Sequence, residues 1–259
     1  MEKIVVSFDS VLWNNYTGEY GNVKEYLQIL FKEKEPIPMK KLNFFKQDEK
    51  DNYVVAFDNL CENLWHKMKF HKATYLVLPY LYELVEKQDD KEWEFKILQA
   101  AGIACATEIK QYEDIPSNIT KAFRRSKELI LAKELDFINN NIEFLKRKSD
   151  FDRIELYVGI IALMGYSKLS YSLLMSMPWD KIFIECPHCR NTMDIEMKNI
   201  KSTKYAENFD RIKMVLRVME LIEDDKIKEK FEKFYEYQVC NKCNKKFLIE
   251  EGLQKNFIK

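Results

Sequence analysis

The chain has 259 residues, of which 46% are hydrophobic and 32% are charged. This length is sufficient for one large domain or two smaller ones, each with a buried core. The 42 basic and 42 acidic residues cancel to a formal net charge of zero, which argues against a surface dedicated to nucleic acid. Gly and Pro number only six each, and this low content favours helices over strands.

Apolar residues recur at helical spacing through most of the first 177 residues. The first twenty residues are predicted to be irregular, and a helix is expected from Gly21 until Pro36 and Pro38 stop it. Further helices are predicted over residues 50–68, 73–86, 91–109, 117–131, 134–147, 151–166 and 168–177. In the second of these, Pro79 marks either the first turn of a helix or a kink.

Consecutive amphipathic helices of this kind bury their apolar stripes by stacking helix pairs on helix pairs. No exact repeat is legible in the sequence. We therefore predict an all-α fold, a HEAT/ARM-like α-solenoid, with a helical-repeat domain over residues 1–180.

The pattern changes after Pro178. Short strands are predicted at residues 181–185, 192–197, 237–239 and 246–249. Residues 204–236 again show helical spacing, with a break at the acidic run 223–225. Residues 181–259 are therefore predicted to form a small zinc ribbon, a β element interrupted by a helical insertion. This ribbon either stands apart or docks on the last helices through Trp179 and Phe183.

Two Cys-x-x-Cys motifs carry the clearest chemical signal. Cys186 and Cys189 form the first pair, and Cys240 and Cys243 form the second. Zinc prefers four soft or borderline ligands in a tetrahedron, and each motif offers two thiolates from one tight turn between strands. The four cysteines are therefore predicted to bind one structural Zn²⁺ per chain, with no open coordination position.

The separation of the two motifs departs from the usual pattern. Fifty residues lie between Cys189 and Cys240, where four-cysteine sites usually have about 15–20. The helical insertion resolves this difficulty if it leaves the ribbon and returns to it. His188 is expected to be exposed and not to bind the metal. Lysines near the second motif either contact phosphate or form a solvated face, and the second reading is favoured.

No motif for catalysis is legible in the chain. The sequence contains no glycine-rich phosphate loop, no His-Glu-x-x-His and no Gly-x-Ser-x-Gly. Cys61 and Cys105 lie on apolar helical stripes and are interpreted as structural thiols. Cys61 and His66 are five residues apart, which is not one helix face, so no nucleophile–base pair is predicted. A non-enzymatic protein is expected.

The sequence also bears on location. Residues 1–9 contain no sustained apolar segment, so no secretory signal is predicted. The longest apolar stretch, near residues 157–164, is too short to span a bilayer. A soluble, cytoplasmic protein without membrane contact is expected. In that compartment thiols stay reduced, so paired cysteines indicate metal ligands before disulfides.

Two clusters of residues between positions 10 and 86 carry a resemblance to a known family. The first is Trp13 followed by Tyr20-Gly21 and an apolar helix. The second is Leu64-Trp65-His66 followed by Ala73-Thr74 and Leu78-Pro79-Tyr80-Leu81. This third of the chain resembles the HEAT-like helical proteins of bacteria that are associated with toxin-immunity systems. The family's turn after the histidine usually reads Gln-Gly-Thr, where this chain has Lys67-Met68-Lys69.

The resemblance implies an α-solenoid that binds a protein partner, and it supplies no catalytic residues. The resulting hypothesis is a protein-binding scaffold, an immunity protein whose partner is a cognate toxin domain. The alternative is a nucleic-acid-associated regulator that uses the zinc ribbon. The neutral net charge favours the first hypothesis.

Overall fold

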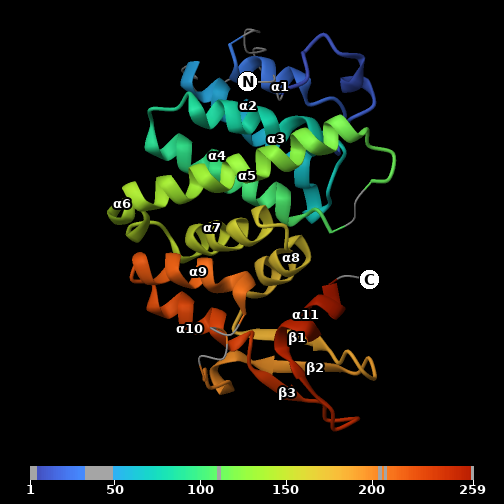
Figure 1. The fold of residues 1–259 in the computed structure, drawn as a ribbon, viewed down its shortest axis with the longest axis vertical. Coiled ribbons are helices and arrows are strands. Elements are labelled where there is room, and N and C mark those ends of the chain that lie inside the picture. Colours follow the sequence, from blue (N-terminus) through green and yellow to red (C-terminus); the bar gives the residue numbers. More distant parts are fainter. Residues whose placement is uncertain (1–4, 33–48, 110–111, 204–205, 207–208, 258–259) are drawn as a thin grey trace, which may run out of the picture. The chain divides into compact units, whose positions relative to one another are not determined.

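The computed structural model describes residues 5–32, 49–109, 112–203, 206 and 209–257. The chain is mostly helical, with two small antiparallel sheets near the C-terminal end (Figure 1), which confirms that part of the prediction. It forms two compact units, residues 1–130 and 131–259, and helix α5 (Ser117–Asn140) continues from one unit into the other. The domain boundary expected after residue 180 stays a prediction.

The N-terminal unit is built from helices that pack on one another. Its elements before α5 are η1 (Val11–Asn14), α1 (Lys24–Leu30), α2 (Glu49–Trp65), η2 (His66–Met68), α3 (Ala73–Glu86) and α4 (Lys91–Ala106). Helix α1 packs against α2 and α3, and α4 packs against α2 and α3. The helix expected from Gly21 begins three residues later. Its expected stop at Pro36 and Pro38 lies outside the described residues.

Helix α3 is the central element of this unit, because eleven of its residues are buried. It begins at Ala73, so Pro79 lies inside it and the reading that placed Pro79 in a first turn is wrong. A proline there removes one backbone donor from the helix ladder. Burial of the surrounding apolar side chains compensates for that loss.

The turn after α2 joins the two clusters on which the resemblance rests. The Tyr20 hydroxyl lies 2.9 Å from His66 Nδ1, and the Tyr20 backbone N–H donates to Asn63 Oδ1 at 2.9 Å. Lys67 and Met68 follow with φ of 51° and 57°, in the left-handed region that non-glycine residues rarely adopt. Lys67 and Met68 are therefore two consecutive strained residues in this turn.

The C-terminal unit contains the rest of the helices and both sheets. After α5 its elements are α6 (Ile142–Lys146), α7 (Asp150–Leu163), α8 (Ser167–Ser176), β1 (Lys181–Glu185), β2 (Thr192–Glu196), η3 (Met197–Asn199), α9 (Asp210–Leu221), α10 (Asp225–Lys233), β3 (Tyr237–Val239), β4 (Lys246–Leu248) and α11 (Ile249–Phe257). Helix α7 packs against α8 and α9. The break expected at residues 223–225 is confirmed: Glu223 has φ of 60°, and the Asp224 side chain caps α10.

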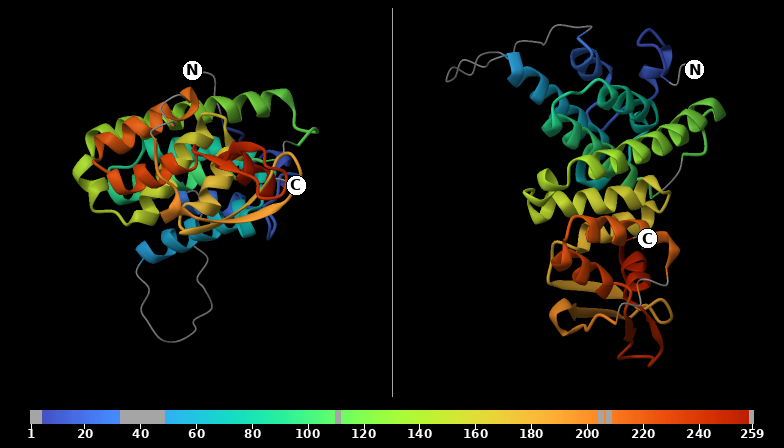
Figure 2. Two further views of the ribbon diagram at one scale, coloured as in Figure 1. Left: turned by 90° about the horizontal axis from the view of Figure 1, so that it is seen from below. Right: turned by 60° about the vertical axis from the view of Figure 1, so that its left-hand side comes forward.

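Helix α11 joins the ribbon to the helices of its unit, and the sequence reading missed it. It packs against both β1 and α8 (Figure 2). The buried face of β1 carries Ile182 and Ile184. Trp179 is 64% exposed and Phe183 is 52% exposed, so these two side chains do not dock the ribbon on the helices. Docking occurs through the opposite face of β1.

None of the described helices combines the length and the apolar character that crossing a bilayer requires.

Candidate metal centre

Each Cys-x-x-Cys motif forms the turn of a two-stranded hairpin. Strand β1 pairs antiparallel with β2, and Cys186 follows β1 directly. The Arg190 N–H donates to the Cys186 carbonyl at 2.9 Å, and the Cys186 N–H donates to the Asn191 carbonyl at 2.9 Å. These two bonds close a compact loop in which both sulfurs face the same side.

The second motif repeats this geometry between β3 and β4. The Asn244 N–H donates to the Cys240 carbonyl at 2.9 Å, and the Cys240 N–H donates to the Lys245 carbonyl at 3.0 Å. The residue after the second cysteine is left-handed in both loops, with φ of 61° at Arg190 and 56° at Asn244. The same local fold therefore occurs twice.

The structure brings all four predicted ligands together. The Sγ atoms of Cys186 and Cys243 are 3.7 Å apart, and those of Cys189 and Cys240 are 3.6 Å apart. All four sulfurs lie within 4.8 Å of one another. A disulfide needs about 2.05 Å, so these are separate thiols. In the described part of the chain, no other group of three or more His, Cys, Asp or Glu offers such a cluster.

These distances suit a tetrahedral metal. Zinc–sulfur bonds of about 2.3 Å place neighbouring sulfurs of a tetrahedron about 3.8 Å apart. The distances between Cys186 and Cys243 and between Cys189 and Cys240 are close to that value. The four cysteines can therefore hold a metal ion with little rearrangement, and their arrangement is consistent with zinc.

A hydrogen bond between the two loops holds them in register. Asn191 Nδ2 donates to Asn241 Oδ1 at 2.7 Å. Asn191 lies two residues after Cys189, and Asn241 lies between Cys240 and Cys243. The sequence analysis assigned neither asparagine a role. No spacing rule points to them, because an amide next to a cysteine motif is common on solvated turns.

Thiol protonation differs between the loops. The backbone N–H groups of Cys243 and Lys242 lower the pKa of Cys240 to about 6, because hydrogen bonds to sulfur favour the thiolate. Burial raises this pKa, but its effect is smaller than that of the hydrogen bonds. The backbone N–H of Asn191 lowers the pKa of Cys189, but burial and the neighbouring thiols outweigh it and raise the pKa to about 12. Four crowded thiols cannot all ionise without a cation, so a bound metal must displace protons.

Exposed cations lie next to the cysteines in the sequence. Arg190, Lys242 and Lys245 are all exposed beside the cysteines. Four thiolates around a divalent ion keep a net negative charge, and these cations reduce its electrostatic cost. Lys246 instead lies 4.0 Å from the Tyr237 ring centroid. His188 is exposed and outside the sulfur cluster, as predicted.

The other cysteines do not join this cluster. Cys105 is buried and Cys61 is half-buried, and both are free thiols. Burial raises the pKa of Cys61, so it stays protonated and unreactive at neutral pH. His66 contacts Glu62 and Tyr20, with 2.5 Å between Nδ1 and the Glu62 carboxylate.

A comparison of the chain with family models, with curated proteins and with solved structures finds no match.

Proposed function

We propose that Cys186, Cys189, Cys240 and Cys243 bind one structural Zn²⁺, which fixes the two hairpins as a zinc ribbon. The observation that carries this proposal is the sulfur cluster, in which two loops fifty residues apart present four thiols within 4.8 Å of one another. When bound, the ion supplies cross-linking and no reaction chemistry, because four protein ligands leave no open position.

The bound ion contributes to folding because the site does not exist in the unfolded chain. Structural zinc contributes about 10–16 kcal/mol in finger peptides. Here it connects β1 and β2 with β3 and β4, two separate sheets with no strand pairing between them among the described residues. Without the ion, the fully buried sulfurs of Cys186 and Cys240 lose the metal bond that this proposal gives them.

The test is the metal content of protein purified without added metal, together with its melting temperature with and without a strong chelator. We expect one zinc per chain and a loss of more than ten degrees on chelation. Cys243→Ser should reproduce that loss, whereas Cys61→Ser, a half-buried cysteine outside the cluster, should retain zinc. Absence of metal from the wild-type chain contradicts the proposal.

The wider function we propose is a non-enzymatic protein-binding scaffold, a HEAT-like α-solenoid that acts as an immunity protein for a toxin domain. Stacked helices offer extended surfaces, and a neutral net charge suits a protein partner better than nucleic acid. The contact between Tyr20 and His66, which joins the two clusters of the resemblance, supports this reading.

The immunity role predicts that a cognate toxin domain is encoded near this chain, and co-expression of the two tests it. We expect a one-to-one complex by light scattering and restored growth of cells that express the toxin. Growth inhibition that persists despite co-expression contradicts the immunity role.

A nucleic-acid-associated regulator remains the second candidate, because Arg190, Lys242 and Lys245 are exposed on the ribbon. It predicts binding to DNA or RNA that weakens steeply with salt. Replacement of the three cations together should abolish that binding. The scaffold predicts no such binding.

A further inference from the structure

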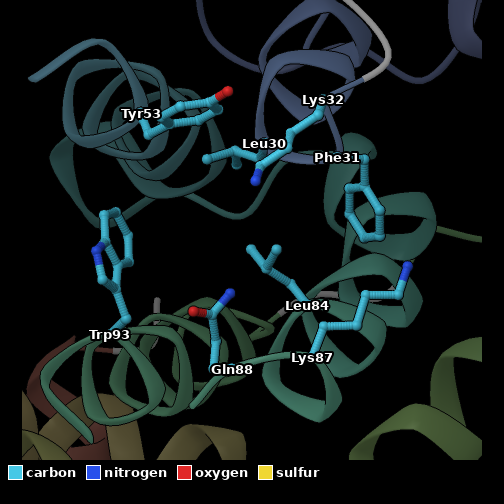
Figure 3. A pocket seen from close by; sticks show the side chains of 8 residues that line it. All are labelled: Leu30, Phe31, Lys32, Tyr53, Leu84, Lys87, Gln88 and Trp93. Carbon is cyan, nitrogen blue, oxygen red and sulfur yellow. The ribbon is translucent and has the colours of Figure 1, made fainter. Parts of the chain in front are cut away.

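A cavity of about 430 Å³ opens among the ends of four helices in the N-terminal unit (Figure 3). Its lining comes from the end of α1, the first turns of α2, the end of α3 and the beginning of α4. Small-molecule sites commonly have volumes of about 300–1,000 Å³. The cavity is therefore large enough for a ligand and lies far from the cysteine cluster in the sequence.

Ring contacts hold the aromatic walls of the cavity. The Trp93 ring meets Phe57 edge-on, with centroids 5.4 Å apart. The Phe31 ring meets Tyr80 edge-on, also at 5.4 Å, and Tyr80 is buried in the core. Edge-to-face pairs of this kind fix ring orientation. The apolar walls are thus formed before any ligand arrives.

The polar groups of the cavity are positively charged or neutral. Lys32, Lys87 and Gln88 line it, and none of its described lining residues is acidic. In Figure 3 the Lys32 ammonium and the Gln88 amide point towards the middle of the open cavity, while Lys87 lies beside Phe31 at its edge. The Lys87 Nζ is 4.6 Å from the Phe31 ring centroid.

Neither lysine is neutralised by the part of the chain that the structure describes. No ion pair within 4.0 Å joins Lys32 or Lys87 to a carboxylate there. Both residues are exposed, and two ammonium groups of like charge at the rim of one cavity attract an anion in preference to a neutral or positive ligand. The described lining therefore combines an apolar body with two ammonium groups that no described carboxylate pairs with.

We propose that this cavity binds a small amphipathic carboxylate, a medium-chain aliphatic acid. Its chain lies between Leu30, Leu84 and Trp93, and its carboxylate accepts hydrogen bonds from Lys32 and Lys87. The Gln88 amide is the third donor. This site is independent of the proposed zinc ribbon and adds ligand binding to the protein.

Calorimetry with the full chain tests this proposal, with decanoate as the probe below its micelle concentration. Decanol and decylamine are matched ligands with the same chain and a neutral or positive head group. We expect saturable one-to-one binding of decanoate and about tenfold weaker binding of decanol. Equal affinity for all three ligands overturns the proposal, and so does the absence of decanoate binding.

Variants locate the site. Lys32→Met and Lys87→Met should each weaken decanoate binding about tenfold, since each removes one charged donor. Leu30→Trp should abolish binding by filling the cavity. The control is Lys96→Met, because Lys96 contacts the same Trp93, with 5.8 Å to the ring centroid, but does not line the cavity. An equal loss in Lys96→Met and the two lining lysine variants contradicts the assigned site.

Discussion

Arg153 Nε donates to the Asp224 carboxylate at 2.7 Å, and both side chains are largely buried. The same carboxylate accepts a hydrogen bond from the Tyr157 hydroxyl at 2.9 Å and from the Ile227 N–H. The contact therefore ties α7 to the capped start of α10. That turn is where the helical insertion reverses towards the second cysteine pair.

Replacement of Arg153 should destabilise the C-terminal unit strongly. Arg153→Met leaves Asp224 as a buried charge without its guanidinium partner, which costs about 3–5 kcal/mol. Chemical unfolding measures this difference. Arg125→Met is the matched control, because Arg125 pairs with Glu128 on an exposed surface and should change stability by less than about 1 kcal/mol. Similar losses in both variants would show that burial of the pair is unimportant.

Because Glu134 is buried, the free energy of unfolding should fall as pH rises. Burial raises its pKa well above 4.5, and neither carboxylate oxygen has a hydrogen-bond partner among the described residues. Above the ordinary pKa the folded chain binds a proton that the unfolded chain has lost, so higher pH favours unfolding. Glu134→Gln cannot ionise and should raise stability by about 1–3 kcal/mol at pH 8 and little at pH 4.

Urea unfolding at both pH values measures this effect. Glu128→Gln, an exposed change on the same helix, should leave the pH dependence of the wild type intact. A Glu134→Gln variant with the wild-type pH slope would contradict the assignment.

Gly252 should tolerate no larger side chain. A Cβ at this position would lie 2.8 Å from Phe247 Cε2 and 3.0 Å from Ile184 Cβ. Gly252→Ala gains helix propensity of about 1 kcal/mol but forces α11 away from β1, and overpacking costs about 1–3 kcal/mol. We expect a lower melting temperature. Lys255→Ala, an exposed change in the same helix, should leave it within one or two degrees; a rise in Gly252→Ala would contradict the close packing.

Replacement of Met68 by glycine should stabilise the protein. Its φ of 57° is in the left-handed region, which costs a residue with a Cβ about 1–2 kcal/mol. Met68→Gly relieves this strain, and we expect a net gain of about 1 kcal/mol in thermal unfolding. Lys69→Gly is the control: its φ is −101°, so glycine there should destabilise the turn. Loss of stability in Met68→Gly would show that Met68 packing outweighs the strain.

Local signals made much of the fold and of the site predictable. The cysteine cluster rests on two motifs whose turns form from neighbouring residues, and the hairpins around them follow short alternating runs. The break before α10 was predicted from the acidic run 223–225, and the structure shows that Asp224 caps the helix. These features depend on a few residues that are adjacent in sequence.

Features set by distant contacts were not predictable. Residues 246–249 read as a strand, but Ile249 begins α11, whose apolar residues pack on β1 and α8. Gly252 in its centre lowers helix propensity and obscures the pattern. Docking through Trp179 and Phe183 was one of two arrangements left open, the other being a ribbon that stands apart. Strand register instead turns Ile182 and Ile184 inward.

The two loops of the cysteine cluster present unequal thiols to solvent. The first cysteine of each pair, Cys186 and Cys240, is fully buried, whereas the second, Cys189 and Cys243, is half-exposed. With a metal ion bound, all four sulfurs would be thiolates, and an alkylating reagent or an oxidant would reach the second cysteine of each loop more readily. Exchange of the proposed ion would then begin at Cys189 and Cys243, while the buried Cys186 and Cys240 stay shielded from solvent.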